Sequence, residues 1–252
     1  MKGVRLSGEF SEYRALPREA AIALSIGGST HAVMMASPDD LVDFAYGFLL
    51  ADGVIAKASD IDDVSIVETD LGIDVQVRLQ NADEYRAQKR AQNRTMVGPV
   101  GCGLCGVESL ELAVPNLVRV KPMPIETALP FEAVAALADA QNLRQKSGAL
   151  HAAGLYDGSK IIHAREDIGR HNALDKSLGA MLRESMDSAN LIAVISSRIS
   201  LDLVIKAVRA GIGTLIGRAS PSDLAVKYAE IWGLKLIAPV FKDEYFISGE
   251  LS

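Results

Sequence analysis

Cysteine is almost absent from this sequence of 252 residues, which contains only Cys102 and Cys105. Two cysteines exclude a fold held together by several disulfide bonds. The chain also lacks an apolar run that approaches the roughly 18 residues of a membrane-spanning helix. Its first 16 residues mix charged and small polar side chains, whereas a secretory signal has an apolar stretch there. We therefore expect a cytoplasmic protein that does not enter a membrane.

An excess of basic residues is missing as well, because 26 Lys and Arg stand against 32 Asp and Glu and give a net charge of −6. Broad binding to a nucleic acid backbone needs a basic face, so we do not expect nucleic acid as a partner. Hydrophobic residues make up 49% of the chain and charged residues 23%, a balance typical of globular proteins. A chain of this length fits one large domain or two compact ones.

The first part of the chain, residues 1–114, has the pattern of an α+β domain. Two short apolar runs, residues 20–26 and 29–35, flank a Gly-Gly pair and predict a hairpin. A Ser-Pro pair then precedes a periodic segment over residues 41–51, which predicts a helix. The other predicted elements of this part are strands over residues 64–67 and 73–79, a helix over residues 81–92 and a helical turn within residues 107–112.

Residues 115–130 contain four prolines and are predicted to link this part to an α/β domain over residues 131–252. Residues 131–146 have the apolar spacing of one amphipathic helix, and Asp157 and Gly158 predict a tight hairpin turn. The further predicted elements are strands over residues 152–156, 160–164, 191–196, 214–216 and 235–240, and helices over residues 171–185, 201–210 and 223–232. This alternation predicts a largely parallel sheet covered by helices on both faces, which is a three-layer αβα arrangement.

Both cysteines lie in the sequence Gly-Cys-Gly-Leu-Cys-Gly, within a glycine-rich stretch over residues 98–106. In a C-x-x-C pair the second thiol stabilises the thiolate of the first. The glycines let the backbone approach a partner closely and adopt unusual φ values. We interpret Cys102 and Cys105 as working thiols, displayed on a loop that collects a sulfur cargo at one place and delivers it at another.

Three other interpretations of the thiol pair stay open. A dithiol redox pair normally opens a helix directly after a strand, which this glycine-rich stretch does not. A zinc site needs about four ligands, so histidines would have to complete it, from the set His31, His151, His163 and His171. Two inert cysteines are the third interpretation. We expect no resident metal, and we expect His31, His151 and His163 to be structural residues.

A second group of polar residues follows the predicted strand that ends near residue 164. Residues 164–176 read Ala-Arg-Glu-Asp-Ile-Gly-Arg-His-Asn-Ala-Leu-Asp-Lys. Arg170 could bind a phosphate through two parallel hydrogen bonds, and His171 could transfer a proton. The junction between a strand and a helix is also where α/β sheets bind their ligands. We therefore predict a binding site here.

A third group follows the next predicted strand, where residues 196–200 read Ser-Ser-Arg-Ile-Ser. Hydroxyl groups and an arginine at the start of a helix are suited to hold an anion. Residues 219–222, Ala-Ser-Pro-Ser, repeat the pattern after the strand that comes next. Two neighbouring strand ends with such loops favour a ligand that contains phosphate.

Taken together, these motifs resemble the FdhD/NarQ family of formate dehydrogenase accessory sulfurtransferases. The segments that carry the resemblance are Gly101 to Gly106 with both cysteines, the segment around His151, the run Glu166-Asp167-Ile168-Gly169-Arg170-His171-Asn172-Ala173-Leu174-Asp175-Lys176, and Ser197-Arg198-Ile199-Ser200. Recognisable pieces run in the expected order from about Ser25 to Tyr228.

The resemblance implies that Cys102 carries a persulfide taken from a cysteine desulfurase, with Cys105 as its partner. The sulfur would pass to the molybdenum of a bis(molybdopterin guanine dinucleotide) cofactor, bound as cargo, which formate dehydrogenase needs for activity. The resemblance also implies that the second half has a fold similar to cytidine deaminases, without their zinc chemistry, because Ala153 stands where the deaminase H-x-E motif has its acid. We expect a homodimer, since two large cofactor lobes suit a symmetric groove.

We expect the cofactor to contact three strand-end loops and the C-terminal strand. The expected cofactor-binding residues are Glu166, Asp167, Arg170, His171, Asn172, Asp175, Ser197, Arg198, Ser200, Ser220, Pro239, Val240, Phe241, Lys242, Asp243 and Glu244. Some positions depart from the family pattern. Ser197 stands where the family usually has Gly, Asp202 where it has Glu, and the C-terminal strand lacks the usual Gly-Phe followed by a basic residue.

Two further hypotheses for the function belong to other classes. The protein could deliver the pterin dinucleotide without sulfur chemistry, or it could be a C-x-x-C dithiol oxidoreductase. The sequence does not identify the donor desulfurase or the client molybdoenzyme.

Overall fold

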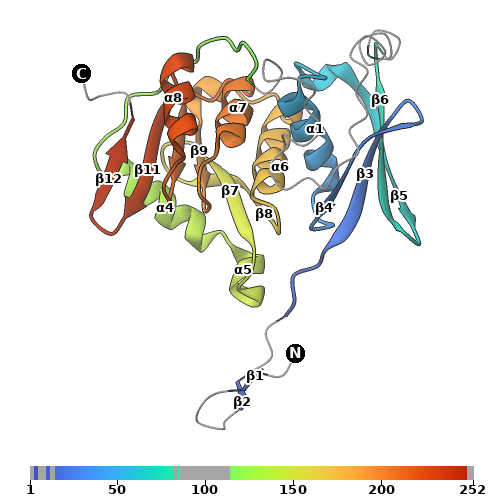
Figure 1. Ribbon diagram of the computed structural model, residues 1–252, viewed down its shortest axis with the longest axis horizontal. Helices are drawn as coiled ribbons and strands as arrows, with labels where there is room; N and C mark the ends of the chain where they lie inside the picture. The colour runs from blue at the N-terminus through green and yellow to red at the C-terminus, as the bar shows by residue number, and fades with distance from the viewer. Residues whose placement is uncertain (1–2, 5–9, 12–14, 82–84, 86–113, 249–252) are drawn as a thin grey trace.

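The computed structural model describes residues 3–4, 10–11, 15–81, 85 and 114–248. These residues form two large β-sheets, a short β1–β2 pair (Gly3–Val4 and Phe10–Ser11) and six α-helices (Figure 1). The chain is therefore a mixed α/β protein. The predicted helices over residues 81–92 and 107–112, and the loop with Cys102 and Cys105, lie outside the described residues except for Asn81 and Tyr85. No helix within the described ranges is long and apolar enough to cross a membrane.

The N-terminal sheet has four strands in the order β4–β3–β6–β5, with bounds β3 Ala20–Ile26, β4 Ser29–Ala36, β5 Ile61–Thr69 and β6 Gly72–Leu79. The predicted hairpin of β3 and β4 is confirmed, and Gly27 and Gly28 turn with φ values of 56° and 81°, which favour glycine. The predicted helix is also confirmed as α1, Leu41–Asp52. One face of this sheet buries alternate apolar residues of β3 and β6 against the helix layer.

The C-terminal sheet has six strands in the order β12–β11–β10–β9–β7–β8. The strands are β7 His151–Tyr156, β8 Ile161–Asp167, β9 Ile192–Ile195, β10 Thr214–Gly217, β11 Lys235–Phe241 and β12 Glu244–Ile247. Helix α4, Leu129–Asp139, packs on one face, and α6 Arg170–Arg183, α7 Leu201–Arg209 and α8 Asp223–Trp232 cover the other (Figure 1). The predicted three layers of helix, sheet and helix are present.

The prediction that this sheet is largely parallel was wrong. Only β9–β10 and β10–β11 pair in parallel, whereas β7–β8, β7–β9 and β11–β12 are antiparallel. The hairpin predicted at Asp157 and Gly158 is confirmed as β7–β8, and β11–β12 is a second hairpin. Both pairs are antiparallel because a tight turn permits only antiparallel neighbours. The β7–β9 pair joins strands that are separated in the chain by β8 and α6, so no local signal shows its direction. The sequence analysis also missed β12, which has only four residues.

The single helix predicted over residues 131–146 is two helices, α4 and α5 (Asn142–Ser147). The break lies at Gln141, whose ψ of 71° is not helical. The carboxylate of Glu166 accepts hydrogen bonds from the backbone N–H groups of Leu143 and Arg144, at 2.6 and 2.7 Å. Because these N–H groups have no partner inside a new helix, the carboxylate stabilises the second start.

The two halves share one hydrophobic core, which includes apolar residues of both sheets. Helix α1 lies between the N-terminal sheet and α6 (Figure 1), and the two helices touch at Gly47 and Gly179. A Cβ atom on Gly47 would lie 1.7 Å from the carbonyl oxygen of Asp175, so only glycine permits this approach. The predicted linker packs on α8, where the N–H of Val120 donates to the carbonyl of Trp232 at 2.8 Å. The division into domains stays a prediction.

Candidate anion-binding site

The sheet pairing brings the predicted strand-end loops to one edge. Strands β9, β10 and β11 are parallel, so the loops that follow them leave the sheet on the same side. The end of β8 and the start of β7 lie there too, because His151 pairs with Asp167 and the N–H of Ser196 donates to the carbonyl of Ala152 at 2.9 Å. We call this the carboxyl edge, and it is the lower edge of the C-terminal sheet in Figure 1.

The loops follow the strand order along the carboxyl edge. The loop after β8 comes first, then the start of β7, the loop after β9, the loop after β10 and the turn between β11 and β12. Adjacent strands lie about 4.8 Å apart, so the four spacings from β8 to β11 span about 19 Å. Such a row can contact an extended ligand at several points.

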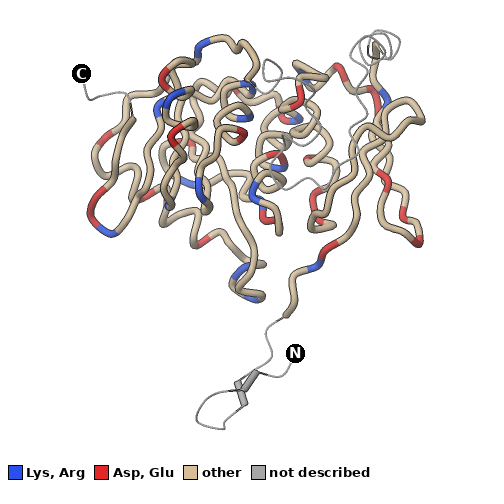
Figure 2. Tube along the Cα trace, in the orientation of Figure 1, with Lys and Arg blue, Asp and Glu red and all other residues tan. Residues whose placement is uncertain are grey.

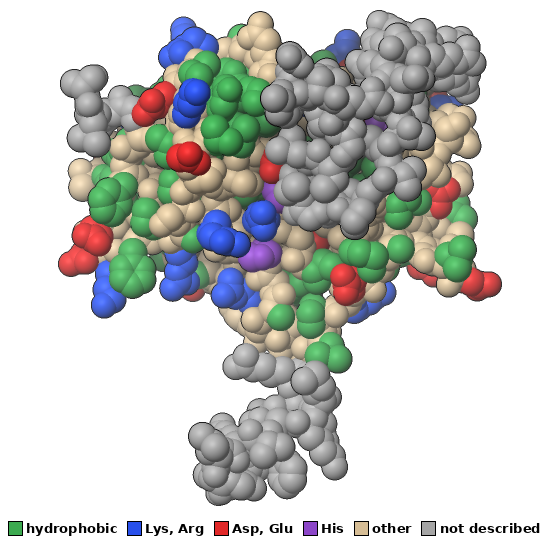
Figure 3. Space-filling model, in the orientation of Figure 1, with side chains coloured by type: hydrophobic (Ala, Val, Ile, Leu, Met, Phe, Trp, Pro, Cys, Tyr) green, Lys and Arg blue, Asp and Glu red, His purple; other side chains and the backbone are tan. Residues whose placement is uncertain are grey.

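Arginine side chains on this edge lack counter-charges. Within the described part of the chain, Arg144, Arg170, Arg198 and Arg218 have no ion-pair or hydrogen-bond partner for their guanidinium groups. Arg198 and Arg218 are exposed. The Nε atom of Arg170 is buried and still has no partner, and a buried donor of this kind is costly unless a ligand or water completes it. Figure 2 shows basic segments recurring along this edge, and Figure 3 shows Lys, Arg and His side chains grouped over the lower middle of the same face.

The acidic residues of the same motif turn inward. The carboxylate of Asp167 is fully buried and accepts four hydrogen bonds, from Lys176 Nζ at 2.7 Å, the Ser37 N–H at 3.0 Å, the Gly169 N–H at 2.7 Å and Asn172 Nδ2 at 3.0 Å. All four donors belong to the protein, so Asp167 shapes the loop and offers no free oxygen to a ligand. Asn172 is likewise engaged, because the same nitrogen donates to the carbonyl of Met35.

Asp175 and Glu166 also serve the fold. Asp175 is buried and accepts two hydrogen bonds of 2.7 Å from Lys206 Nζ. Burial raises the pKa of Asp175, and the neighbouring Lys206 opposes this rise. Glu166 caps α5. The predicted contact of Glu166, Asp167 and Asp175 with a cofactor therefore has no free carboxylate to support it. Because the negative charges are used inside the protein, the arginines leave the edge positive.

His171 lies on the first turn of α6 and faces the start of α7. Its Nε2 lies 3.4 Å from Ser200 Oγ and 3.6 Å from a carboxylate oxygen of Asp202. The side chains of His171 and Asp202 are only 13% and 11% exposed. Asp202, which departs from the family pattern, thus orients His171 instead of facing a ligand. This role was not predicted.

The serines connect neighbouring loops. Ser197 is buried and its hydroxyl donates to the carbonyl of Arg198 at 3.0 Å. The N–H of Ile199 donates to the carbonyl of Ser220 at 3.4 Å, and Ile199 forms an isolated bridge with Pro221. These contacts fix the loops after β9 and β10 relative to each other, so that Arg198 and Arg218 are held on one rigid frame.

The C-terminal candidates form the far end of the carboxyl edge. Pro239, Val240 and Phe241 belong to β11, Lys242 and Asp243 form the turn, and Glu244 opens β12. Val240 is buried in the core beneath α4, so its side chain cannot reach a ligand. Phe241 is 52% exposed, and the turn residues are exposed. Of these six residues, those at the turn can meet a ligand that spans the row.

His151, which the sequence predicts to be a structural residue, lies on the same edge. It opens β7 in the middle of the carboxyl edge, beside the loops that begin with Asp167 and Ser196. Burial lowers the pKa of His151, and the positive charges of Arg170 and Arg144 lower it further. The sequence does show that His151 directly precedes the predicted strand over residues 152–156. In the structure this strand pairs with β8, which leads into the loop with Arg170. His31, in contrast, is held away from this edge by Tyr85 and Asp52, at 2.7 and 2.9 Å.

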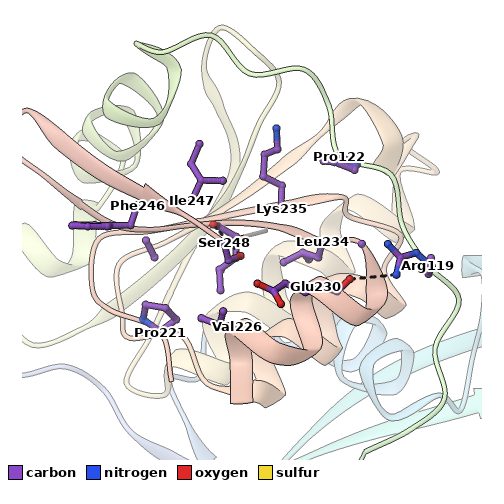
Figure 4. Close-up of a pocket in the computed structure, with 13 residues that line it drawn as sticks. Arg119, Pro122, Pro221, Val226, Glu230, Leu234, Lys235, Phe246, Ile247 and Ser248 are labelled. Carbon is purple, nitrogen blue, oxygen red and sulfur yellow. Dashed lines mark hydrogen bonds between the residues drawn. The ribbon is translucent and has the colours of Figure 1, made fainter. Parts of the chain in front are cut away.

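A cavity lies elsewhere, between α8 and the β11–β12 hairpin. It has a volume of about 850 Å³ and an apolar lining that includes Val226, Leu236 and Phe246 (Figure 4). Arg119 lines it too, but its guanidinium donates to the carbonyls of Glu230 and Ile231. The cavity therefore lacks the unpaired cations of the carboxyl edge.

Metal binding has no support among the side chains that the structure describes, since no group of three or more His, Cys, Asp or Glu residues there could hold an ion. Cys102 and Cys105 lie outside the described residues, so their geometry plays no part in this site.

The model of the family described as FdhD/NarQ matches residues 17–247. The sulfur carrier protein FdhD of Agrobacterium fabrum is 43% identical over 250 residues, which cover 98% of this chain and 90% of the relative. That of Brucella abortus is 42% identical over 246 residues, covering 96% and 91%. A crystal structure described as a formate dehydrogenase accessory protein from Desulfotalea psychrophila has the same fold, with a TM-score of 0.73 at 23% identity, covering 98% of this chain and 94% of that chain.

Proposed function

Because the chain belongs to the FdhD/NarQ family, we propose that it is a sulfurtransferase that carries sulfur as a persulfide on Cys102. The sulfur comes from a cysteine desulfurase and goes to the molybdenum of a bis(molybdopterin guanine dinucleotide) cofactor destined for formate dehydrogenase. The curated relatives bear the name sulfur carrier protein, which supports the carrier role.

The loading step is a thiol exchange. The thiolate of Cys102 attacks the outer sulfur of the persulfide on the desulfurase, the sulfur–sulfur bond of the donor breaks, and the donor cysteine leaves as a thiolate. No electrons are gained or lost overall, because one persulfide replaces another.

Delivery as sulfide needs two electrons, and Cys105 can supply them. Its thiolate attacks the inner sulfur, which is that of Cys102, so that the outer sulfur leaves as sulfide and a Cys102–Cys105 disulfide forms. The C-x-x-C spacing, with only two residues between the thiols, suits such a resolving step. A cellular dithiol reductant then restores the pair.

One structural observation supports the cofactor as the cargo: the row of arginines on the carboxyl edge that have no partner among the described residues, which includes the buried Nε of Arg170. The cofactor contains two diphosphate groups, and guanidinium groups bind phosphate oxygens in pairs. Arg170, Arg198 and Arg218 would hold the phosphates, while Asp167 and Asp202 position the groups beside them. The molybdenum centre is where the sulfur is used.

We also propose that the protein acts in the cytoplasm as a homodimer. Its partners are a cysteine desulfurase and a molybdoenzyme. The three layers around the C-terminal sheet correspond to those of cytidine deaminases.

Mass spectrometry of the intact protein tests the carrier assignment. After incubation with a cysteine desulfurase and cysteine, the protein should gain the mass of one sulfur atom, and a thiol reductant should remove it. Cys102→Ala should not gain it, whereas Cys105→Ala should. Equal gain by Cys102→Ala and the unchanged protein would rule out Cys102 as the carrier.

The charged edge also favours a second candidate, delivery of the pterin dinucleotide without sulfur chemistry, because the described arginines could bind it by themselves. This candidate predicts that a protein with alanine at both cysteine positions still activates its molybdoenzyme. Loss of activation in that variant, with binding of the dinucleotide retained, favours sulfur transfer. A Cys102–Cys105 reduction potential within the range of dithiol oxidoreductases would instead favour a redox role.

A further inference from the structure

His151 is placed where a ligand on the carboxyl edge would meet it. It is the first residue of β7, it is partly buried, and it pairs across the sheet with Asp167, three residues before Arg170. The N–H of the next residue, Ala152, donates to Ser196 Oγ at 2.9 Å, so the loop after β9 lies on its other side. The imidazole therefore lies between the loop with Arg170 and the loop with Arg198.

The imidazole has no partner of its own among the residues that the structure describes, because neither ring nitrogen makes a hydrogen bond or an ion pair there. The other histidines of this sequence do have partners: His31 contacts Asp52 and Tyr85, His163 contacts Glu184, and His171 contacts Asp202 and Ser200. The ring nitrogens of His151 are thus open to a ligand, and they lie near Arg170, whose buried Nε has no partner among the described residues and calls for one.

The charged groups around His151 come from three elements. Arg144 belongs to α5, Arg170 and His171 belong to α6, and Asp167 ends β8. Of these groups only Asp167 favours a protonated imidazole, and its carboxylate is already bound to Lys176. Glu166, the neighbour of Asp167, is bound to the start of α5. Without a ligand, burial and the surrounding cations therefore disfavour a protonated imidazole.

We infer that His151 is a further binding residue of the carboxyl edge, and that it takes up a proton when a diphosphate group binds there. The inference rests on the proposed function for the class of ligand and extends it to a residue that the sequence predicted to be structural. A bound diphosphate supplies negative charge and neutralises Arg170 and Arg144, which removes the repulsion that disfavours an imidazolium. The imidazolium can then donate a hydrogen bond to a phosphate oxygen.

The affinity for the diphosphate should depend on pH, because His151 has a different pKa in the free protein and in the complex. The pKa of free His151 is lowered by burial and by the arginines, whereas that of the complex is raised by the anion. Binding is therefore tightest below the pKa of the free protein and weakens as the pH rises through the pKa of the complex. A shift of one unit between the two states changes the affinity about tenfold across this window.

Calorimetry of the full chain with diguanosine diphosphate tests the inference. This diphosphate diester has no phosphate oxygen that titrates near neutral pH, so proton uptake reports on the protein. Titrations in two buffers of different ionisation enthalpy should show uptake of up to about one proton between about pH 5 and 7, the range where histidine titrates. The affinity should fall about tenfold from the acidic to the alkaline side.

Two variants and one control make the result specific. His151→Gln should bind the diester with little uptake and a nearly flat pH profile. Arg144→Gln removes one cation beside the ring, so the pH window should move upward with His151 unchanged. His163→Gln, on β8 but away from the edge, should behave like the unaltered protein.

Uptake that persists in His151→Gln, or an affinity of the unaltered protein that does not change with pH, overturns the inference. Failure of the diester to bind overturns it together with the anion site. Sulfur loading of Cys102 is measured without the diester, so that result is separate and bears only on the proposed carrier function.

Discussion

Asp167 and Lys176 form an ion pair of 2.7 Å in which neither side chain is exposed to solvent. Lys176 Nζ also donates to the carbonyl of Ser37 at 2.9 Å, and Asp167 accepts from the N–H of the same residue. Ser37 lies 130 residues away in the chain and directly follows β4. The pair therefore fixes the end of the N-terminal sheet against the loop that presents Arg170 and His171.

Replacing Lys176 with methionine should destabilise the protein strongly. The substitution keeps the length of the side chain but leaves the carboxylate of Asp167 buried without its counter-charge, which typically costs about 3–5 kcal/mol. Urea unfolding measures the change in the free energy of unfolding. The double variant Asp167→Asn with Lys176→Met should lose less than the two single variants added together. Simple additivity would contradict a direct interaction.

The pair of Asp175 and Lys206 should make stability depend on pH. Burial raises the pKa of Asp175 from its usual value of 3.8, and Lys206 opposes this rise. A carboxyl group with a raised pKa in the folded state contributes stability at low pH, and this contribution is lost as the pH rises through the folded-state pKa. In Lys206→Met the pKa of Asp175 should rise further. The substitution should therefore lower the free energy of unfolding little near pH 4 and by about 1–3 kcal/mol more near pH 7.

Unfolding of this variant at both pH values checks the sign. Lys227→Met is the matched control, since Lys227 is exposed on α8 and should change stability by less than about 0.5 kcal/mol at either pH. An equal loss at the two pH values for Lys206→Met would show that the ammonium group does not lower the pKa of Asp175.

Alanine at Gly47 should separate α1 from α6. The added Cβ would lie 1.7 Å from the carbonyl oxygen of Asp175, and that backbone atom cannot turn aside as a side chain could. We expect a loss of about 3 kcal/mol in the free energy of unfolding, although alanine favours a helix by about 1 kcal/mol over glycine. Gly28→Ala is the comparison, because that position has open space but a φ of 81°, and it should lose about 1 kcal/mol. Equal losses would mean that the crossing tolerates a Cβ atom.

The local elements could be predicted from the sequence, whereas the pairing between distant elements could not. Gly-Gly and Asp-Gly turns and apolar periodicity sufficed for the hairpin of β3 and β4 and for α1, because these signals act between near neighbours. Nothing in the periodicity of residues 131–146 shows that Glu166, more than 20 residues further along, caps a second helix there. The antiparallel pairing of β7 with β9 was missed for the same reason.

The candidate site could be predicted as a set of loops, and less well as a set of roles. Strand-end position places Arg170, Arg198 and Ser220 on one edge, as the parallel strands require. Asp167 and Arg170 are both charged residues of one motif, so the sequence does not show which of them has a partner. In the structure Asp167 is paired with Lys176, whereas the Nε of Arg170 has no partner among the described residues. Burial and ion pairing separate Asp167 from Arg170, and the lack of a partner among the described residues separates His151 from the other histidines.

Arg170 should contribute more to diphosphate binding than an arginine of equal charge elsewhere. Arg170→Gln removes a guanidinium with no partner among the described residues, and a charged hydrogen bond is worth about 1.5–3 kcal/mol, so the affinity for diguanosine diphosphate should fall about tenfold or more. Arg183→Gln, on the same helix but paired with Asp43, should change it less than threefold. Calorimetry at fixed salt measures both. Equal effects would mean that net charge, and not the carboxyl edge, determines binding.

Cys105 should be needed to release sulfur but not to accept it. In the proposed delivery step its thiolate displaces the outer sulfur from Cys102 as sulfide, and the two thiols become a disulfide. Cys105→Ala should therefore load one sulfur atom and then release sulfide at least tenfold more slowly without an added thiol, an effect of about 1.4 kcal/mol on the barrier.

Sulfide release from the loaded protein, measured with a sulfide-specific dye, gives the rate. Mass spectrometry of the unaltered protein should detect the disulfide as a loss of two hydrogens. An added dithiol should restore release in Cys105→Ala, because it replaces the missing thiol. If Cys105→Ala releases sulfide at the normal rate, a group other than Cys105 supplies the two electrons.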